Sequence, residues 1–373
     1  MTTTETRHRL RDLGIAIGRL QPGPHNAITD VSGVKVGHST IIEGEGDLVV
    51  GKGPIRTGAT VVWPHSDGSI AADPVYGAYH QLNGNGEMTG IPWIIESGLV
   101  SSPIAITNTH SVGVVRDALI AYELARFPKE KDVDWGLPIV AETYDGWLND
   151  INGFHVKPEH LFAAADSATA GPVVEGCVGG GTGMNCHEFK GGIGTSSRVL
   201  QDPSKPWTVG VLVQANYGLR ANFRVDGVPV GRELTYEHTP GMREKVAGAG
   251  SIIIIIATDA PILPDQCRRL AQRAAIGLAR VGGNGNNSSG DIFLAFSTGN
   301  RGMMLGEIAD PFAVQSLQPE AMSPLFEAVA DATEEAILNA LCAATTMVGA
   351  NGRTSHALPL TDLQDVMRKY NRL

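Results

Sequence analysis

The chain has 373 residues, of which 42% are hydrophobic and 18% charged, a balance typical of soluble globular proteins rather than disordered chains. Its formal net charge of −10 repels a phosphate backbone, so nucleic acid is not expected as a partner. The first residues carry no apolar signal segment, the cysteines lack a C-x-x-C spacing, and the longest apolar run, residues 252–257, is too short to cross a bilayer. We therefore expect a cytoplasmic protein without a membrane partner.

Strands dominate the predicted structure of the first part of the chain. Short apolar and β-branched runs bounded by Gly, Pro and Asn predict strands at residues 28–41, 57–64 and 103–110. Helical spacing of apolar residues follows at 112–127. Residues 138–147 and 206–219 predict two more strands with polar residues at their ends, where functional groups are often placed.

The second part of the chain alternates strands with long helices. Residues 248–261, GAGSIIIIIATDAP, contain five consecutive isoleucines and predict a strand buried on both faces. Residues 264–283 and 323–344 predict helices, and 291–298 a buried strand. This mixture, without a regular βαβ rhythm or a linker, favours an α/β fold of layered sheets covered by helices, in a single domain spanning residues 1–373.

Ser251 begins the isoleucine run, directly after Gly250. Because glycine tolerates unusual backbone conformations, Gly250 can hold the next peptide in a geometry in which Oγ of Ser251 attacks the preceding carbonyl carbon. Hydrolysis of the resulting ester would leave Ser251 with a free α-amine, whose ordinary pKa of about 8 lets it accept the hydroxyl proton. One residue would then supply nucleophile and base. Taken alone, a small-residue turn entering a core strand explains the same residues.

A second polar cluster, GGNGNNSSGDIFLAF, places Ser288, Ser289 and Asp291 in a loop before a predicted strand. We expect Asp291 to orient Ser289, and Ser289 to hold or exchange a proton with Ser251. A solvated turn that caps the strand is the alternative interpretation. The GNG portion lacks the G-x-G-x-x-G spacing, so a nicotinamide-dependent oxidoreductase is disfavoured.

Several segments together identify a family. The segments NAITDVSGVKVGHSTI, TNTHSVGVVRDAL, AETYDGWLND, GGGTGMNCHEFKGGIGTSSR, GAGSIIIIIATDAP and SSGD resemble the DmpA and BapA family of self-processing aminopeptidases, over nearly the whole chain. The resemblance implies a four-layer α/β/β/α sandwich, similar in architecture to amino-terminal-nucleophile hydrolases. It also implies cleavage between Gly250 and Ser251 into residues 1–250 and 251–373, and a homotetramer of cleaved protomers.

The resemblance further implies roles for individual residues. Ser251 matches the family nucleophile, and Ser289 and Asp291 match the hydroxyl and the acidic residue that accompany it. Asn216 matches an asparagine that stabilises the oxyanion, and Tyr144 an active-site tyrosine; an amide N–H and a phenolic O–H are suitable donors toward developing negative charge. Without the resemblance, these two residues would instead be interpreted as a turn-forming asparagine and a partly buried core tyrosine.

Glu142 lies two residues before Tyr144, so we expect both on the same side of an extended strand. A carboxylate there can bind the ammonium group of a substrate. A strand-edge carboxylate without that role is the alternative.

The glycine-rich residues 179–194 lack the G-K-[ST] ending of a phosphate loop, and we expect them to pack closely around the site. His187 and Cys186 have no partner at metal-ligand spacing, so neither a metal nor another cofactor is expected.

The predicted function is hydrolysis of an amide or ester next to the free amino group of a small peptide, amino amide or ester. A self-cleaving acyltransferase and a non-catalytic binding protein are the alternatives. The choice among L-α-amino amides, D-amino acid esters and β-peptides depends on pocket shape and stays open.

Overall fold

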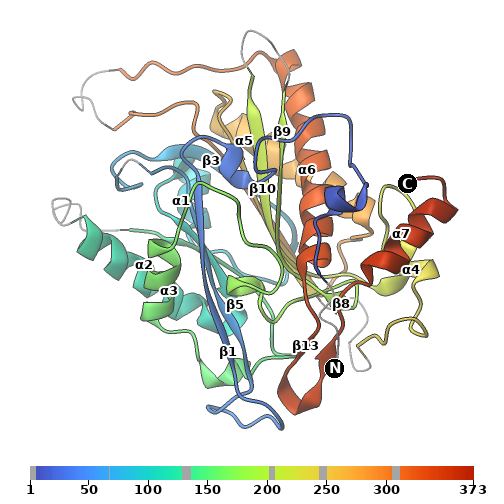
Figure 1. Ribbon diagram of the computed structural model, residues 1–373. Coiled ribbons are helices and arrows are strands. Elements are labelled where there is room, and N and C mark those ends of the chain that lie inside the picture. Colours follow the sequence, from blue (N-terminus) through green and yellow to red (C-terminus); the bar gives the residue numbers. More distant parts are fainter. Residues whose placement is uncertain (1–5, 67, 128–135, 201–205, 243–249, 305–310) are drawn as a thin grey trace.

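The computed structural model describes residues 6–66, 68–127, 136–200, 206–242, 250–304 and 311–373 (Figure 1). Two sheets form its centre. One is four-stranded in the order β1 (Lys35–Glu43), β2 (Ile55–Trp63), β5 (Ile104–Asn108) and β6 (Ile139–Thr143). The other is six-stranded in the order β4 (Leu99–Val100), β3 (Val75–Gly84), β12 (Ser289–Ser297), β11 (Gly250–Thr258), β10 (Thr208–Asn216) and β9 (Gly192–Val199).

Helices cover the outer face of each sheet. The four-stranded sheet shares a hydrophobic cluster with α2 (Val112–Arg126) and α3 (Pro158–Asp166), and the six-stranded sheet shares another with α5 (Pro264–Val281) and α6 (Met322–Ala343). A third cluster joins the inner faces of the two sheets. Figure 1 shows α2 and α3 on the side of β1, and α6 beside β9. The expected α/β/β/α layering is therefore confirmed.

The remaining α-helices and strands are short. They are the helices α1 (Ile91–Ser97), α4 (Val230–Glu233) and α7 (Leu360–Lys369), and the strand pairs β7 (Asn185–Cys186) with β8 (Phe189–Lys190) and β13 (Met347–Val348) with β14 (Thr354–Ser355). No helix among the described residues has both the length and the apolar character needed to cross a membrane.

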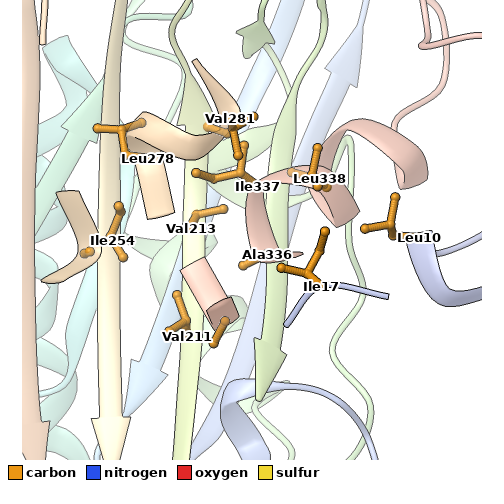
Figure 2. Close-up of a cluster of buried hydrophobic side chains, with 14 of the residues drawn as sticks. Leu10, Ile17, Val211, Val213, Ile254, Leu278, Val281, Ala336, Ile337 and Leu338 are labelled. Carbon is orange, nitrogen blue, oxygen red and sulfur yellow. The ribbon is translucent and has the colours of Figure 1, made fainter. Parts of the chain in front are cut away.

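The isoleucine run forms the core of β11, as expected. Ile252, Ile254 and Ile256 pack toward α5 and α6, whereas Ile253 and Ile255 pack between the two sheets. Figure 2 shows Ile254 in one cluster with Val213 of β10, Leu278 of α5 and Ile337 of α6. Because each fully buried isoleucine stabilises the fold by about 1.5–3 kcal/mol, this strand is a firmly held support for Ser251.

Two strand boundaries differ from expectation. β12 begins at Ser289 instead of 291, so Ser289 and Asp291 belong to a strand paired on both sides and not to the loop before it. β6 ends at Thr143, which leaves Tyr144 beyond the strand. The end of a strand is set by its hydrogen bonds to neighbouring strands. Where the residues at that end are polar, the sequence alone does not show where the strand begins or ends.

Candidate active site

Strand register brings the predicted site residues to one end of β11. Ser251 pairs with Asn216 of β10 on one side and with Gly290 of β12 on the other, and Gly250 pairs with Ser289. Ser251 is only 6% exposed, and its Oγ accepts a hydrogen bond of 3.1 Å from the backbone N–H of Gly290. A single strand end thus carries the proposed nucleophile and the proposed cleavage site.

Gly250 is required by close packing. Its φ is +156°, a value that L side chains rarely adopt, and a Cβ atom there would lie 2.6 Å from the carbonyl oxygen of Asn216. No larger residue fits at this position without moving the backbone of β10. The preceding residues of the motif, Gly248 and Ala249, lie outside the described residues.

Ser289 and Asp291 form the pair expected from the sequence. Oγ of Ser289 donates to Oδ1 of Asp291 at 2.6 Å, and Nδ2 of Asn83 donates to Oδ2 at 3.2 Å. Burial raises the pKa of the Asp291 carboxyl, and these two hydrogen bonds oppose the rise. The carboxylate is thereby held in one orientation.

This pair and the Ser251 hydroxyl lie on opposite faces of the sheet. Side chains alternate along a strand, so Ser251 shares a face with Ile253, which packs between the sheets, whereas Ser289 and Asp291 share a face with Phe293, which packs toward the helices. Within the described residues no hydrogen bond joins the Ser251 and Ser289 hydroxyls. Instead, Ser289 and Asp291 line one small pocket together with Gly250, the residue bonded to the backbone nitrogen of Ser251.

Asn216 faces the gap between the sheets, on the Ser251 side. Its Oδ1 accepts from the backbone N–H of Asn185 at 2.9 Å, and its Nδ2 donates to the carbonyl oxygen of Tyr144 at 2.8 Å. These bonds fix the amide beside Ser251 and leave the second N–H of Nδ2 for another acceptor. The predicted donor is therefore positioned by main-chain groups on both sides.

Tyr144 joins the site through its backbone. Its side chain is 52% exposed, and its Oη lies over Gly146, where a Cβ atom would be 2.4 Å away. Its hydroxyl is thus folded back over the following turn, and the contact of Tyr144 with Asn216 is made by the backbone carbonyl oxygen.

Glu142 is buried, with 3% of its surface exposed. Oε1 accepts from the backbone N–H of Glu87 at 3.0 Å, and Oε2 accepts from the Thr109 hydroxyl. Burial raises the pKa of this carboxyl. The expectation that Glu142 shares a strand face with Tyr144 is wrong, because β6 ends between them.

Gly86 connects Glu142 to the strand that carries the Ser289–Asp291 pair. A Cβ atom on Gly86 would lie 3.1 Å from Cα of Gly290 and 3.2 Å from Oε1 of Glu142. Gly86 therefore lies between the Glu142 carboxylate and Gly290, whose N–H binds the Ser251 hydroxyl.

Sequence reasoning missed three contributors: Asn83, Asn185 and the N–H of Gly290. Each acts through a contact between segments far apart in the chain, so only the sheet order could have revealed it. It also missed Asp145, a fully buried carboxyl whose pKa burial raises to about 7.

The glycine-rich segment packs tightly behind the site, as expected. A Cβ atom on Gly180 would lie 2.2 Å from Oε1 of Gln214. Within the described part of the chain, no group of three or more His, Cys, Asp or Glu side chains is arranged to hold a metal ion.

Comparison with known proteins gives consistent matches. The family description of peptidase family S58 matches residues 26–355. The beta-peptidyl aminopeptidase BapA of Sphingosinicella microcystinivorans is 50% identical over 377 residues, which cover 98% of this chain and 93% of that protein.

Solved structures agree in fold. A beta-aminopeptidase from Burkholderia is 51% identical with a TM-score of 0.86, over 97% of this chain and 99% of that one. The L-aminopeptidase D-Ala-esterase/amidase of Ochrobactrum anthropi, described as a variant of the Ntn-hydrolase fold, is 43% identical with a TM-score of 0.88, over 98% and 99% of the two chains. These matches confirm the resemblance and the fold expected from the sequence.

Proposed function

We propose that this chain, which belongs to peptidase family S58 and is an aminopeptidase that hydrolyses peptide bonds, cuts itself between Gly250 and Ser251 and then uses Ser251 as its nucleophile. The observation that carries the proposal is the placement of Ser251 at the start of β11, with its Oγ held by the N–H of Gly290 and the Ser289–Asp291 pair beside Gly250.

In the proposed self-cleavage, Oγ of Ser251 attacks the carbonyl carbon of Gly250. The bond from that carbon to the Ser251 nitrogen breaks, and the hydroxyl proton ends on the nitrogen as a free α-amine. Water then hydrolyses the ester. The attack is intramolecular, because the hydroxyl belongs to the residue that directly follows this carbonyl group.

The order of strands in the six-stranded sheet supports a single domain that stays folded after self-cleavage. β11 and β12 would belong to fragment 251–373, yet they lie between β10 and β3 of fragment 1–250. β10 pairs with β11 over eight register partners, and β12 pairs with β3 on the other side. The two fragments would therefore stay associated without a covalent link.

The proposed turnover uses both faces of the sheet. The freed α-amine of Ser251 takes the proton of its own Oγ, while Ser289 and Asp291 orient that amine from the helix-facing side. The Asn216 amide stabilises the oxyanion from the inter-sheet side; loss of one such donor typically costs about a hundred-fold or more in rate. The role of Tyr144 as a hydroxyl donor toward the oxyanion, implied by the resemblance, stays a prediction, and Glu142 binds the substrate ammonium group.

The proposed substrates are small peptides, amino amides or esters with a free amino terminus. The names of two relatives, at 50% and 51% identity, favour a β-amino acid at the amino terminus as the first class to test. The name of the Ochrobactrum relative makes L-aminoacyl amides and D-alanyl esters the second.

The proposed assembly is a homotetramer of cleaved protomers in the cytoplasm. Support comes from exposed apolar side chains at the ends of two strands and in the loop between β1 and β2: Ile42 of β1, Leu48, Val49 and Val50 of the loop, and Val348 of β13. The N–H of Leu48 donates to Oδ1 of Asn351, between β13 and β14, at 2.8 Å, which joins the two segments. Clustered exposed apolar side chains mark protein interfaces. Light scattering should give about four times the 39.3 kDa of one chain, and a monomer mass would contradict this part.

The proposed function is tested by intact-mass measurement and amino-terminal sequencing of purified protein, together with an assay on β-alanyl and L-alanyl anilides. We expect fragments 1–250 and 251–373, a new amino-terminal serine, and release of the anilide. A full-length chain with activity would contradict the self-cleavage.

A further inference from the structure

A small cavity lies beside the proposed scissile peptide, on the helix-facing side of the six-stranded sheet. It is lined by Gly250, Ser289, Asp291 and Tyr217, and by the loop 282–286 that follows α5. Its volume is about 10 Å³. A space of this size holds one water molecule, provided that polar groups surround it.

Tyr217 supplies a polar group that the fold does not otherwise use. Its side chain is 4% exposed, and its Oη has no hydrogen-bond partner within the described residues. The ring is held in place by edge-on packing against His187, with centroids 4.9 Å apart, and by contact with Gly283. A buried hydroxyl without a partner is costly, so a rigidly held one next to a water-sized cavity points to a bound water molecule.

Ser289, which also lines the cavity, supplies a hydrogen-bond acceptor. Oγ of Ser289 uses its hydrogen to bond Asp291 at 2.6 Å, which leaves its oxygen lone pairs to accept a proton from another donor. A water molecule in the cavity can accept from Oη of Tyr217 and donate to Oγ of Ser289. It would then present its oxygen to Gly250.

We infer that this cavity binds the water molecule that hydrolyses the ester intermediate of self-cleavage, and that Tyr217 positions this water. The inference rests on the proposed self-cleavage and adds to it a site for the second step. The water oxygen bonds to the carbonyl carbon of Gly250, and the bond from that carbon to Oγ of Ser251 breaks. One water proton passes by way of Ser289 and the freed α-amine to the Ser251 oxygen. The other leaves as the new Gly250 carboxyl group ionises.

The test follows maturation of newly made chains. Wild type, Tyr217→Phe and the control Tyr122→Phe are synthesised in a cell-free reaction, and cleavage is followed over time by intact mass. Tyr122 is a suitable control because it packs in the helix layer of the four-stranded sheet, where its hydroxyl bonds Asp166 at 2.6 Å. Phenylalanine at 217 keeps the packing ring, and thermal unfolding of each protein verifies that it folds.

We expect Tyr217→Phe to mature at least ten-fold more slowly and to accumulate the ester. Hydroxylamine distinguishes the two steps, because it cleaves the ester at once and leaves a hydroxamate on Gly250, whereas it leaves an intact amide uncut. The control should mature like the wild type. Maturation of Tyr217→Phe at the wild-type rate, or slow maturation of a folded variant without a hydroxylamine-sensitive chain, would overturn the inference. A wild-type chain that never cleaves would instead contradict the proposed self-cleavage.

Discussion

Ser251 and Ser289 stand on neighbouring parallel strands with their side chains on opposite faces of the sheet, because each is paired with a glycine of the other strand. The backbone nitrogen of Ser251 lies between the two faces. A proton can therefore pass from the Ser251 hydroxyl to its own α-amine, and the Ser289–Asp291 pair can act on that amine. This arrangement supports the proposed mechanism, in which self-cleavage must precede turnover.

Replacing Ser251 with alanine should abolish both self-cleavage and turnover, because no other hydroxyl occupies the start of β11. Mass spectrometry should show a single full-length chain, and activity should fall by about 10³-fold or more. Ser288→Ala is the matched control, since its carbonyl oxygen, which accepts from Asn85 at 2.8 Å, is retained. Substantial activity in the alanine variant at 251 would place the nucleophile elsewhere.

Asp291→Asn should leave a folded protein with kcat reduced by roughly 10²-fold or more. The asparagine amide can still accept the hydrogen bond of Ser289, but it lacks the negative charge of the carboxylate. The substitution keeps the size of the side chain at position 291 and the pairing of β12. Thermal unfolding checks folding, and steady-state kinetics of the cleaved fraction measure kcat. Near-normal turnover would contradict the role of the pair.

The pH dependence of turnover should reflect the buried carboxyl. Burial raises the pKa of Asp291, so its charge is lost at a higher pH than for an ordinary carboxyl as the solution is acidified. Turnover needs the ionised carboxyl as well as the neutral α-amine of Ser251, so at lower pH than the limb of the amine the kcat profile should show a second acid limb, which lies above the usual carboxyl range. This second limb should disappear in Asp291→Asn, and an unchanged limb would assign it to another group.

Much of this site could be predicted from local sequence. Ser251, Gly250 and the isoleucine run were recognisable because each depends on its own strand, and Ser289 and Asp291 because they are two residues apart. The contacts of Asn83 with Asp291 and of Asn185 with Asn216 could not be predicted, since they depend on β3 lying beside β12 and on β7 folding back to β10. The relation between Glu142 and Tyr144 was mistaken for a similar reason: strand pairing ends β6 one residue before Tyr144.

Asn216→Ala should reduce kcat by about a hundred-fold or more, because it removes the neutral donor beside Ser251. Some loss of stability is also expected, since the carbonyl oxygen of Tyr144 and the N–H of Asn185 lose their partner. Comparison of kcat with thermal unfolding separates the two effects. A variant as unstable as expected but fully active would show that the amide serves only the fold.

Glu142→Gln should weaken the binding of substrates through their ammonium group. This prediction can be tested by changing the substrate amine and by changing the Glu142 carboxylate. Acetylation of the substrate amine removes its charge and should nearly abolish hydrolysis by the wild type, whereas a chelator should have little effect on either substrate.

The glutamine variant keeps the shape of Glu142 and should lower kcat/KM for free-amino substrates by roughly ten-fold or more, if the pair contributes about 1.5–3 kcal/mol. Glu87→Gln is the matched control, because Glu87 is exposed and its backbone N–H, which donates to Glu142 at 3.0 Å, is kept; loss of the Glu87 charge should lower the pKa of Glu142 and leave its carboxylate in place.

A pH series identifies the group responsible. Because burial raises the pKa of Glu142, the wild type should lose affinity for the ammonium group as pH falls through a range above that of ordinary carboxyls, and KM should rise there. The KM of Glu142→Gln should not show this rise.

All measurements require fully cleaved protein, since incomplete self-cleavage lowers kcat by reducing the number of active sites but leaves KM unchanged. Equal hydrolysis of free and acetylated substrates by the wild type would contradict the need for a free amine, while an unchanged kcat/KM in cleaved Glu142→Gln would remove only this residue from ammonium binding.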